Sequence, residues 1–192
     1  MKYANFILIL FTLVTLCYNQ ELTKDQIDKI KEITENVNKA PNFSLKSVSD
    51  SLYVLDEMKG KVVLLNFWAI FCGPCRLEIP DFNDLYDKYN KRGFEILGIS
   101  TIDTKQNLEK FLKAYKMDYP VLYGTPQEIQ NVTSAYGGIY SIPQSFLIDK
   151  NGEIIRAYPG AILKDFNPNM YADLIYNIEA SINKTDIKEI TE

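Results

Sequence analysis

The sequence predicts an α/β fold in which helices cover a buried sheet, and three observations support this class. Apolar runs typical of strands alternate along the chain with segments of helical periodicity. One run, KVVLLNFWA at residues 61–69, is rich in β-branched and aromatic residues, as strands buried on both faces are. The length of 192 residues, 46% of them hydrophobic, suits one or two globular domains.

The N-terminal segment, residues 1–19, is predicted to direct export. Lys2 precedes the apolar run ANFILILFTLVTLC, which suits the hydrophobic region of a secretory signal and is short for a membrane span. No good small-residue cleavage site follows, so cleavage, lipidation at Cys17 and retention as a membrane anchor all stay open. Residues 20–37 are predicted to form an amphipathic spacer helix, which either holds the domain off a membrane or packs on it.

An α/β domain is predicted at residues 38–184, followed by a polar tail at 185–192. Strands are expected at residues 43–48, 52–55, 61–69, 94–100, 119–123, 145–149 and 153–158. Helices are expected at residues 73–92, 105–116, 126–136 and 169–182. Gly93 is placed to end the first of these helices in a left-handed conformation, and Asn151-Gly152 is a strong hairpin signal between the last two strands.

The composition excludes several reaction classes. Histidine is absent, so Ser–His and Cys–His nucleophile pairs, HExxH zinc sites and axial haem histidines are excluded. The 3 cysteines are too few for a disulfide-rich scaffold or a four-cysteine metal site. A net charge of −4 without a basic block argues against nucleic acid as a partner. We therefore expect no metal, no nucleic acid and no bound cofactor.

The candidate chemistry lies in the segment FCGPC, between a buried strand and a helix. Cys72 falls where free backbone N–H groups and the helix dipole stabilise a thiolate, so it is the expected nucleophile. Cys75, one turn further into the helix, is placed to resolve a mixed disulfide. Gly73 and Pro74 suit the tight turn between the strand and the helix. A disulfide that closes so short a loop would stabilise the fold by only about 2 kcal/mol, so redox chemistry explains the pair better than stapling.

Residues 59–100 resemble the thioredoxin superfamily, and more closely its exported TlpA/ResA/DsbE-like branch of thiol–disulfide oxidoreductases. The buried strand, FWA, CGPC, Pro80 inside the helix and the later sequence Ser141-Ile142-Pro143 follow in the order typical of that family, and the match covers about residues 40–183. The resemblance implies a thioredoxin-like fold: a central mixed sheet flanked by helices, with an N-terminal hairpin and a βα insertion. Residues 105–138 would hold most of that insertion.

The same resemblance implies roles for particular residues. Cys72 and Cys75 take the attacking and resolving roles. Pro143 takes the place of the family's cis-proline, which leaves the backbone of Ile142 free to pair with an extended segment of a partner protein. Glu78 matches an acidic residue that tunes a thiol pKa or relays a proton to Cys75. The alternative interpretation of Glu78 is a first-turn acid that is merely favourable to the helix dipole.

Three further positions bear on the site. Trp68 matches the family's aromatic residue beside the active site, where it could contact substrate, and ordinary core packing is the alternative. Asn66 stands where cytoplasmic thioredoxins commonly have a buried aspartate for proton transfer, so Glu78 becomes the more plausible acid–base group. Phe71 replaces the tryptophan usual before the first cysteine, which predicts an exposed apolar collar around Cys72 that contacts substrate.

The leading hypothesis is an exported thiol–disulfide oxidoreductase in the periplasm or cell envelope, monomeric and with membrane anchoring left open. It would reduce disulfides in exported proteins, with apocytochrome c as one candidate, and a membrane thiol carrier would keep it reduced. One alternative is a peroxiredoxin-like peroxide reductase, which is disfavoured because Ala69 stands where a peroxidatic site needs threonine. Another is a thioredoxin-fold binding module without catalysis. The sequence does not fix the direction of electron flow, since 1.4 kcal/mol of thiolate stabilisation moves a two-electron potential by only about 30 mV.

Overall fold

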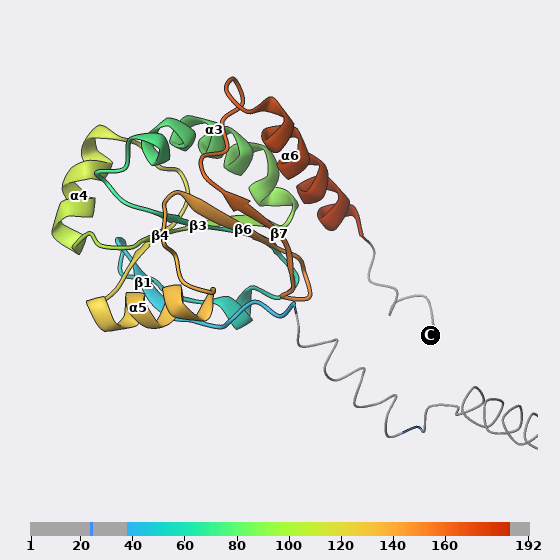
Figure 1. Cartoon of the computed structure of the whole chain (residues 1–192), viewed down its shortest axis with the longest axis horizontal. Coiled ribbons are helices and arrows are strands. Elements are labelled where there is room, and N and C mark those ends of the chain that lie inside the picture. The colour runs from blue at the N-terminus through green and yellow to red at the C-terminus, as the bar shows by residue number, and fades with distance from the viewer. Residues whose placement is uncertain (1–23, 25–37, 185–192) are drawn as a thin grey trace, which may run out of the picture. The chain divides into compact units, whose positions relative to one another are not determined.

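The fold is built around a 7-stranded mixed sheet with the strand order β2-β1-β5-β4-β3-β6-β7 (Figure 1). The structure is a computed structural model, and it describes Lys24 and residues 38–184. The interior strand β3 (Val62–Trp68) runs parallel to β4 (Phe94–Ser100) and antiparallel to β6 (Gln144–Ile148). The remaining strands are β1 (Ser44–Ser47), β2 (Leu52–Val54), β5 (Val121–Tyr123) and β7 (Ile154–Pro159).

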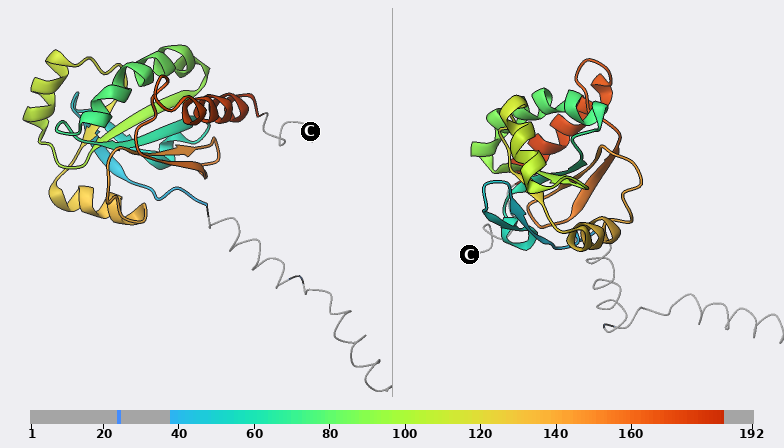
Figure 2. Two further views of the ribbon diagram at one scale, coloured as in Figure 1. Left: turned by 45° about the horizontal axis from the view of Figure 1, so that its top comes forward. Right: turned by 90° about the vertical axis from the view of Figure 1, so that its left-hand side faces the viewer.

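Helices cover both faces of this sheet, as the sequence predicts. The helices are α3 (Gly73–Tyr89), α4 (Lys105–Ala114), α5 (Pro126–Ala135) and α6 (Pro168–Asn183). Figures 1 and 2 show α3 and α6 on one face and α5 on the opposite face. α4 packs beside the start of α3, where Leu108 and Phe111 join the apolar cluster that contains Trp68.

The interior strand β3 explains why two cores form. All residues of β3 are buried, and successive side chains point to opposite faces of a strand. Val63, Leu65 and Phe67 pack into the core that α5 covers. Val62 and Leu64 pack into the core that α3 and α6 cover. The apolar run in the sequence therefore correctly predicts a buried interior strand of the sheet, next to β4, which is the fourth of the seven strands.

The predicted hairpin and insertion are present, with differences at element ends. β1 pairs with β2 in an antiparallel hairpin, and α4, β5 and α5 lie between β4 and β6. The helix predicted at residues 105–116 ends at Ala114 because the backbone of Tyr115 is extended. The helix predicted at residues 73–92 finishes in a 3₁₀ turn, Asn90–Arg92, and Gly93 takes the predicted left-handed conformation with φ 89°. The 3₁₀ turn Leu55–Met58 was not predicted.

Three predicted segments lie outside the described residues: the export segment at residues 1–19, the spacer at residues 20–37 apart from Lys24, and the tail at residues 185–192. Within the part of the chain that the structure does describe, no helix combines the length and the apolarity that a membrane span requires.

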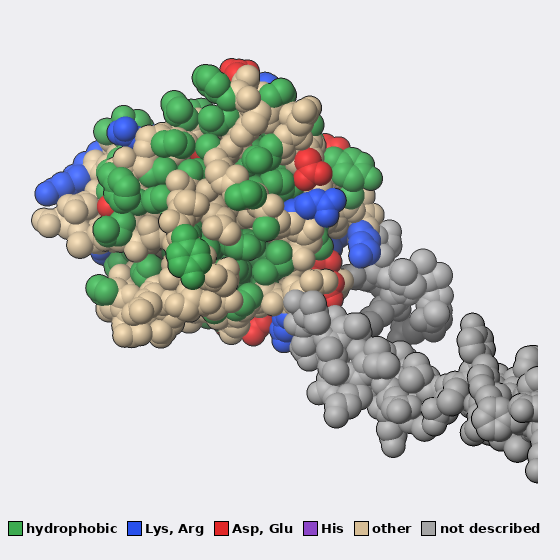
Figure 3. All heavy atoms as spheres, in the orientation of Figure 1, with side chains coloured by type: hydrophobic (Ala, Val, Ile, Leu, Met, Phe, Trp, Pro, Cys, Tyr) green, Lys and Arg blue, Asp and Glu red, His purple; other side chains and the backbone are tan. Residues whose placement is uncertain are grey.

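One face of the domain is notable for its surface composition. Figure 3 shows many hydrophobic side chains in the middle of the face that is turned toward the viewer in Figure 1, whereas most charged side chains lie near the edges. The segment that joins α5 to β6 crosses this face. That segment contains Ile142 and Pro143, so this face includes the surroundings of the predicted site.

Candidate active site

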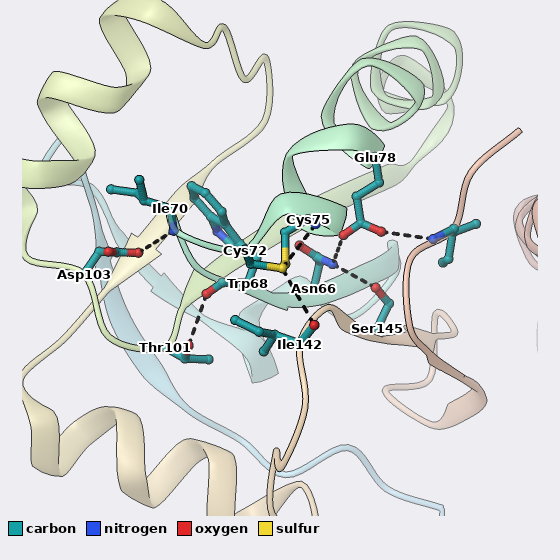
Figure 4. The surroundings of a disulfide bond; sticks show 11 residues. Asn66, Trp68, Ile70, Cys72, Cys75, Glu78, Thr101, Asp103, Ile142 and Ser145 are labelled. Atoms are coloured by element: carbon teal, nitrogen blue, oxygen red, sulfur yellow. Dashed lines mark hydrogen bonds between the residues drawn. A yellow bond between two sulfur atoms is a disulfide. The ribbon is translucent and has the colours of Figure 1, made fainter. Parts of the chain in front are cut away.

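Cys72 and Cys75 form a disulfide at the start of α3, with their Cα atoms 5.3 Å apart (Figure 4). Cys72 has an extended backbone and caps the helix, and its Sγ atom accepts the N–H of Cys75 at an N···S distance of 3.2 Å. This N–H is one of those that a helix leaves free in its first turn. The same N–H stabilises negative charge on Cys72 once the disulfide opens, as a nucleophilic thiolate requires.

The two sulfurs differ in their access to solvent. The side chain of Cys72 is 6% exposed and that of Cys75 only 1%. Pro74 is exposed and Gly73 is half-buried, so the turn between the cysteines leaves the outer sulfur open to approach. A partner sulfur therefore reaches Cys72 first, and Cys75 can act only from inside the domain.

The segment before β6 lies against the outer sulfur. The peptide bond between Ile142 and Pro143 is cis, as the family resemblance implies. The carbonyl oxygen of Ile142 lies 3.7 Å from the Sγ of Cys72, close enough to accept a thiol proton in the dithiol form (Figure 4). Among the described residues, the backbone N–H and carbonyl of Ile142 have no backbone partner, whereas the carbonyl of Pro143 accepts the N–H of Gly160.

A groove of about 560 Å³ opens beside the disulfide, and exposed apolar side chains line it together with neutral polar ones such as Thr101, Gln130 and Ser141. Phe71, Ile102 and Tyr140 line it and are 71%, 68% and 94% exposed, respectively. Ile142 also lines the groove, and Asp103 is the one charged side chain among the described residues that do so. The apolar collar predicted from Phe71 is therefore present, and Ile102 and Tyr140 extend it.

The loop after β4 holds the active-site loop in place. The Oδ2 atom of Asp103 accepts the N–H of Ile70 at 2.9 Å and the hydroxyl of Ser100 at 2.8 Å. The carbonyl oxygen of Trp68 accepts the N–H of Thr101 at 2.9 Å and its hydroxyl at 3.2 Å. These contacts join segments far apart in the sequence, and no local motif predicts them.

Trp68 occupies the core beneath the site. Its side chain is buried in the same cluster as both cysteines, and its ring centroid lies 5.4 Å from that of Phe111. Among the described residues, no hydrogen-bond partner faces its Nε1 atom. Of the two interpretations of Trp68, burial supports core packing, because the side chain cannot contact a substrate on the surface.

Glu78 is buried in the second turn of α3, and the first turn holds no acidic residue, so the alternative interpretation of Glu78 as a first-turn acid merely favourable to the helix dipole is wrong. Its Oε1 accepts an N–H of Asn66 at 2.9 Å, and its Oε2 accepts the backbone N–H of Ile162 at 3.1 Å. Burial raises the pKa of Glu78 from an ordinary value of 4.5 to about 8. The two N–H bonds partly oppose this rise in pKa, and the charge of Asp81 adds to it.

This arrangement can exchange electrons at one sulfur and protons near the other. Figure 4 shows the carboxyl group of Glu78 pointing toward Asn66, next to the disulfide. A pKa near neutrality suits a group that takes and returns a proton. Across the described residues, no cluster of His, Cys, Asp and Glu side chains has the size of a metal site.

The fold and the site together define a thioredoxin-like thiol–disulfide oxidoreductase: a mixed sheet, a disulfide at a helix start, and a cis-proline segment against the outer sulfur. Comparison with known proteins agrees with this class. The chain belongs to the AhpC/TSA family, whose model matches residues 37–157.

Similar proteins with known names identify a more specific group within the thioredoxin-like oxidoreductases. The thiol-disulfide oxidoreductase ResA of Bacillus thuringiensis subsp. konkukian is 34% identical over 166 residues, which cover 86% of this chain and 94% of that protein. ResA of Geobacillus thermodenitrificans is 36% identical over 126 residues, 66% of this chain and 70% of that protein. A crystal structure of a thiol:disulfide interchange protein of the thioredoxin family from Chlorobium tepidum has a TM-score of 0.65 at 31% identity, covering 76% of this chain and 97% of that one. The predicted fold and the predicted thiol–disulfide oxidoreductase activity are thereby confirmed.

Proposed function

We propose that the protein reduces disulfides in exported proteins by dithiol exchange through Cys72 and Cys75. The observation that carries the proposal is the placement of Cys72: it caps α3, accepts the N–H of Cys75 at 3.2 Å and is the more exposed of the two sulfurs. The similarity to thiol–disulfide oxidoreductases supports exchange chemistry at this pair. No other cofactor is needed, because the dithiol form of Cys72 and Cys75 itself carries the two electrons.

The first step joins the protein to its partner. The thiolate of Cys72 attacks one sulfur of the partner's disulfide, so a bond forms between Cys72 and that sulfur while the partner's S–S bond breaks. The released partner sulfur takes a proton from solvent. A mixed disulfide links the two chains, and Cys75 is still a thiol.

The second step releases the reduced partner. Cys75 gives its proton to the carboxylate of Glu78 and attacks the Sγ of Cys72. The bond between Cys72 and Cys75 forms, the mixed disulfide breaks, and the leaving partner sulfur takes the proton that Glu78 held. In total, two electrons and two protons pass to the partner, whose disulfide becomes two thiols.

The groove supports binding of an extended, apolar segment of the partner. A chain whose cysteine bonds to Cys72 must pass Ile142, and the unpaired backbone of Ile142 can add hydrogen bonds to such a chain. Phe71 and Tyr140 expose apolar surface on the groove. The side chain of Asp103 brings a single negative charge to the groove, and its Oδ2 atom is engaged by Ile70 and Ser100. We therefore expect partner cysteines flanked by apolar residues.

Export and electron supply complete the proposal. The apolar segment at residues 1–19 supports export to the periplasm or cell envelope, with cleavage, lipidation at Cys17 and anchoring as its alternatives. Each turnover leaves the disulfide form, so outside the cytoplasm a membrane thiol carrier is a suitable reductant.

Apocytochrome c is one candidate among the exported substrates, and the domain is proposed to act as a monomer. Fractionation of cells that express the full chain or a chain starting at residue 20 tests export, since only the full chain should leave the cytoplasm.

Insulin reduction tests the central activity. The dithiol form should reduce insulin, and the Cys72→Ser variant should not. Intact insulin with the dithiol form, or equal turnover by Cys72→Ser, would contradict the proposal and favour a binding module. Faster consumption of hydrogen peroxide than of insulin disulfides would favour a peroxiredoxin-like reductase.

A further inference from the structure

A buried amide lies against the buried acid. Asn66 on β3 is buried, and its Nδ2 atom lies 2.9 Å from the Oε1 of Glu78 and 3.0 Å from the Oγ of Ser145 (Figure 4). An amide nitrogen carries two N–H donors and accepts nothing. Both N–H groups of Asn66 therefore donate, one to the carboxyl group of Glu78 and one to the hydroxyl oxygen of Ser145 on β6.

The acid is held from two directions. Asn66 on the sheet donates to Oε1, and the backbone N–H of Ile162, in the segment between β7 and α6, donates to Oε2. With both oxygens bonded to fixed donors, the carboxyl group has one orientation. A buried carboxyl group is costly when ionised, and hydrogen bonds to the ionised form offset part of that cost.

We infer that Asn66 is a positioning residue that fixes the carboxyl group of Glu78 for proton exchange with Cys75, and that the two residues act as a unit whose amide and acid can be exchanged. The inference rests on the proposed function, because proton exchange at Cys75 matters only if Cys75 resolves a mixed disulfide.

The geometry allows only one carboxyl group to ionise beside Asn66 and Cys75. An aspartate at position 66 beside Glu78 would bring two carboxyl groups within hydrogen-bond distance, and two such groups in a buried site cannot both ionise. Exchanging the pair, as Asn66→Asp with Glu78→Gln, keeps one acid and one amide. The new amide can donate to the new acid, its oxygen can still accept the N–H of Ile162, and the hydroxyl of Ser145 can donate to the new acid.

The surroundings of Glu78 leave few other groups that titrate with it. The sequence neighbours on α3 are Asp81, whose charge raises the pKa of Glu78, and Cys75. Tyr119 faces Glu78 from the segment before β5, and burial, with the charge of Glu78, raises the pKa of Tyr119 well above its usual range. The contacts of Glu78 from β3 and from the segment before α6 are neutral donors. A change in the pH profile therefore reports the exchanged pair or the thiols.

The experiment compares wild type, Glu78→Gln, Asn66→Asp and the double exchange. Each protein is loaded at Cys72 with a mixed disulfide to a small aromatic thiol, and release of that thiol by Cys75 is followed from pH 5 to pH 10. Glu78→Gln should slow release at pH 7 by about 100-fold and remove the inflection near pH 8, since general acid–base catalysis contributes roughly 10²–10⁴-fold. Asn66→Asp should move the inflection to higher pH. The double exchange should regain at least about 10-fold of the loss in Glu78→Gln, which a merely structural role of Asn66 would not produce.

Controls separate this inference from the proposed function. Asn131→Asp makes the same change at an exposed position of α5, where its side-chain oxygen only accepts from Gln127, and should keep the wild-type profile. A folded double exchange that releases thiol no faster than Glu78→Gln at any pH overturns the inference, as does an unshifted profile in Asn66→Asp. If the double exchange does not fold, the Asn66→Ser variant provides the test instead. It should slow release of the aromatic thiol by roughly tenfold, and a wild-type pH profile in this variant overturns the inference. Normal formation of the mixed disulfide in these variants keeps the proposed function intact, whereas failure of wild type to form it contradicts that function.

Discussion

The two sides of the disulfide have different surroundings. On the outer side, Cys72 lies next to Phe71 and the carbonyl of Ile142, both of which line a groove with exposed apolar side chains. On the inner side, Cys75 lies above a closed polar network in which Asn66 and Ile162 hold Glu78 away from solvent. The difference separates two tasks: the outer side binds a partner and exchanges sulfur bonds, and the inner side manages the proton of the resolving thiol.

The largest expected effects come from removing either sulfur, and they should differ in kind. Cys72→Ser should lower insulin reduction by more than about 10³-fold, because no nucleophile reaches the partner. Cys75→Ser should still attack and should accumulate a covalent complex with the partner, visible by non-reducing electrophoresis and mass spectrometry. Rapid turnover by Cys75→Ser, or a covalent complex formed by Cys72→Ser, would contradict the assignment of outer and inner roles.

The next effect concerns the stability of the disulfide form. The folded pKa of Glu78 is about 8 against an ordinary 4.5, so the folded state binds the proton more tightly than the unfolded state. The stabilisation from the protonated group is complete below pH 4.5 and is lost as pH rises toward 8, by up to about 1.4 kcal/mol per pH unit. In Glu78→Gln this contribution should be missing, so denaturant unfolding should show a flatter dependence on pH. Parallel curves for wild type and variant would show that Glu78 is not a buried acid of high pKa.

A smaller effect is expected on the outer side. Phe71→Ala and Tyr140→Ala should each lower kcat/KM for insulin by about tenfold, since truncating an aromatic anchor at an interface costs about 1–2 kcal/mol. Reduction of a small disulfide such as oxidised glutathione should change little, because it does not fill the groove. Tyr176→Ala removes an exposed aromatic side chain on α6 that does not line the groove, and it serves as the matched control. Equal losses of kcat/KM for insulin and for glutathione would show that the groove does not bind the protein substrate.

The smallest effect should come from the support of the active-site loop. Asp103→Ala leaves the half-buried N–H of Ile70 without its acceptor and should lower the free energy of unfolding by about 1 kcal/mol. Asp103→Asn keeps an acceptor oxygen and should lose less. Denaturant unfolding measures both, and a greater loss in Asp103→Asn would show that the charge rather than the hydrogen bond matters.

The two sides also differ in how much the sequence could predict. Residues 61–69 and the CGPC turn carry local signals, since burial on both faces and helix capping act over a few neighbouring residues. Glu78 could be identified as a candidate acid, but the network around it could not: Ser145, which accepts an N–H of Asn66, lies 79 residues from Asn66, and Ile162, which donates to Glu78, lies 84 residues from Glu78. Such contacts depend on how β6 and the segment before α6 pack against α3. The end of α4 at Ala114 was missed for a similar reason, because Tyr115 leaves the helix while its ring stacks on Phe111.

The equilibrium reduction potential of the Cys72–Cys75 pair tests most directly whether the protein reduces its partners. Equilibration with glutathione buffers at pH 7, followed by alkylation and mass spectrometry, measures the fraction of dithiol form. A potential near that of thioredoxin, about −270 mV, is the predicted result, because a reductant must hold its electrons less tightly than its substrates do. A potential near −120 mV, as in strong oxidants, would contradict the account and assign the opposite direction of electron flow.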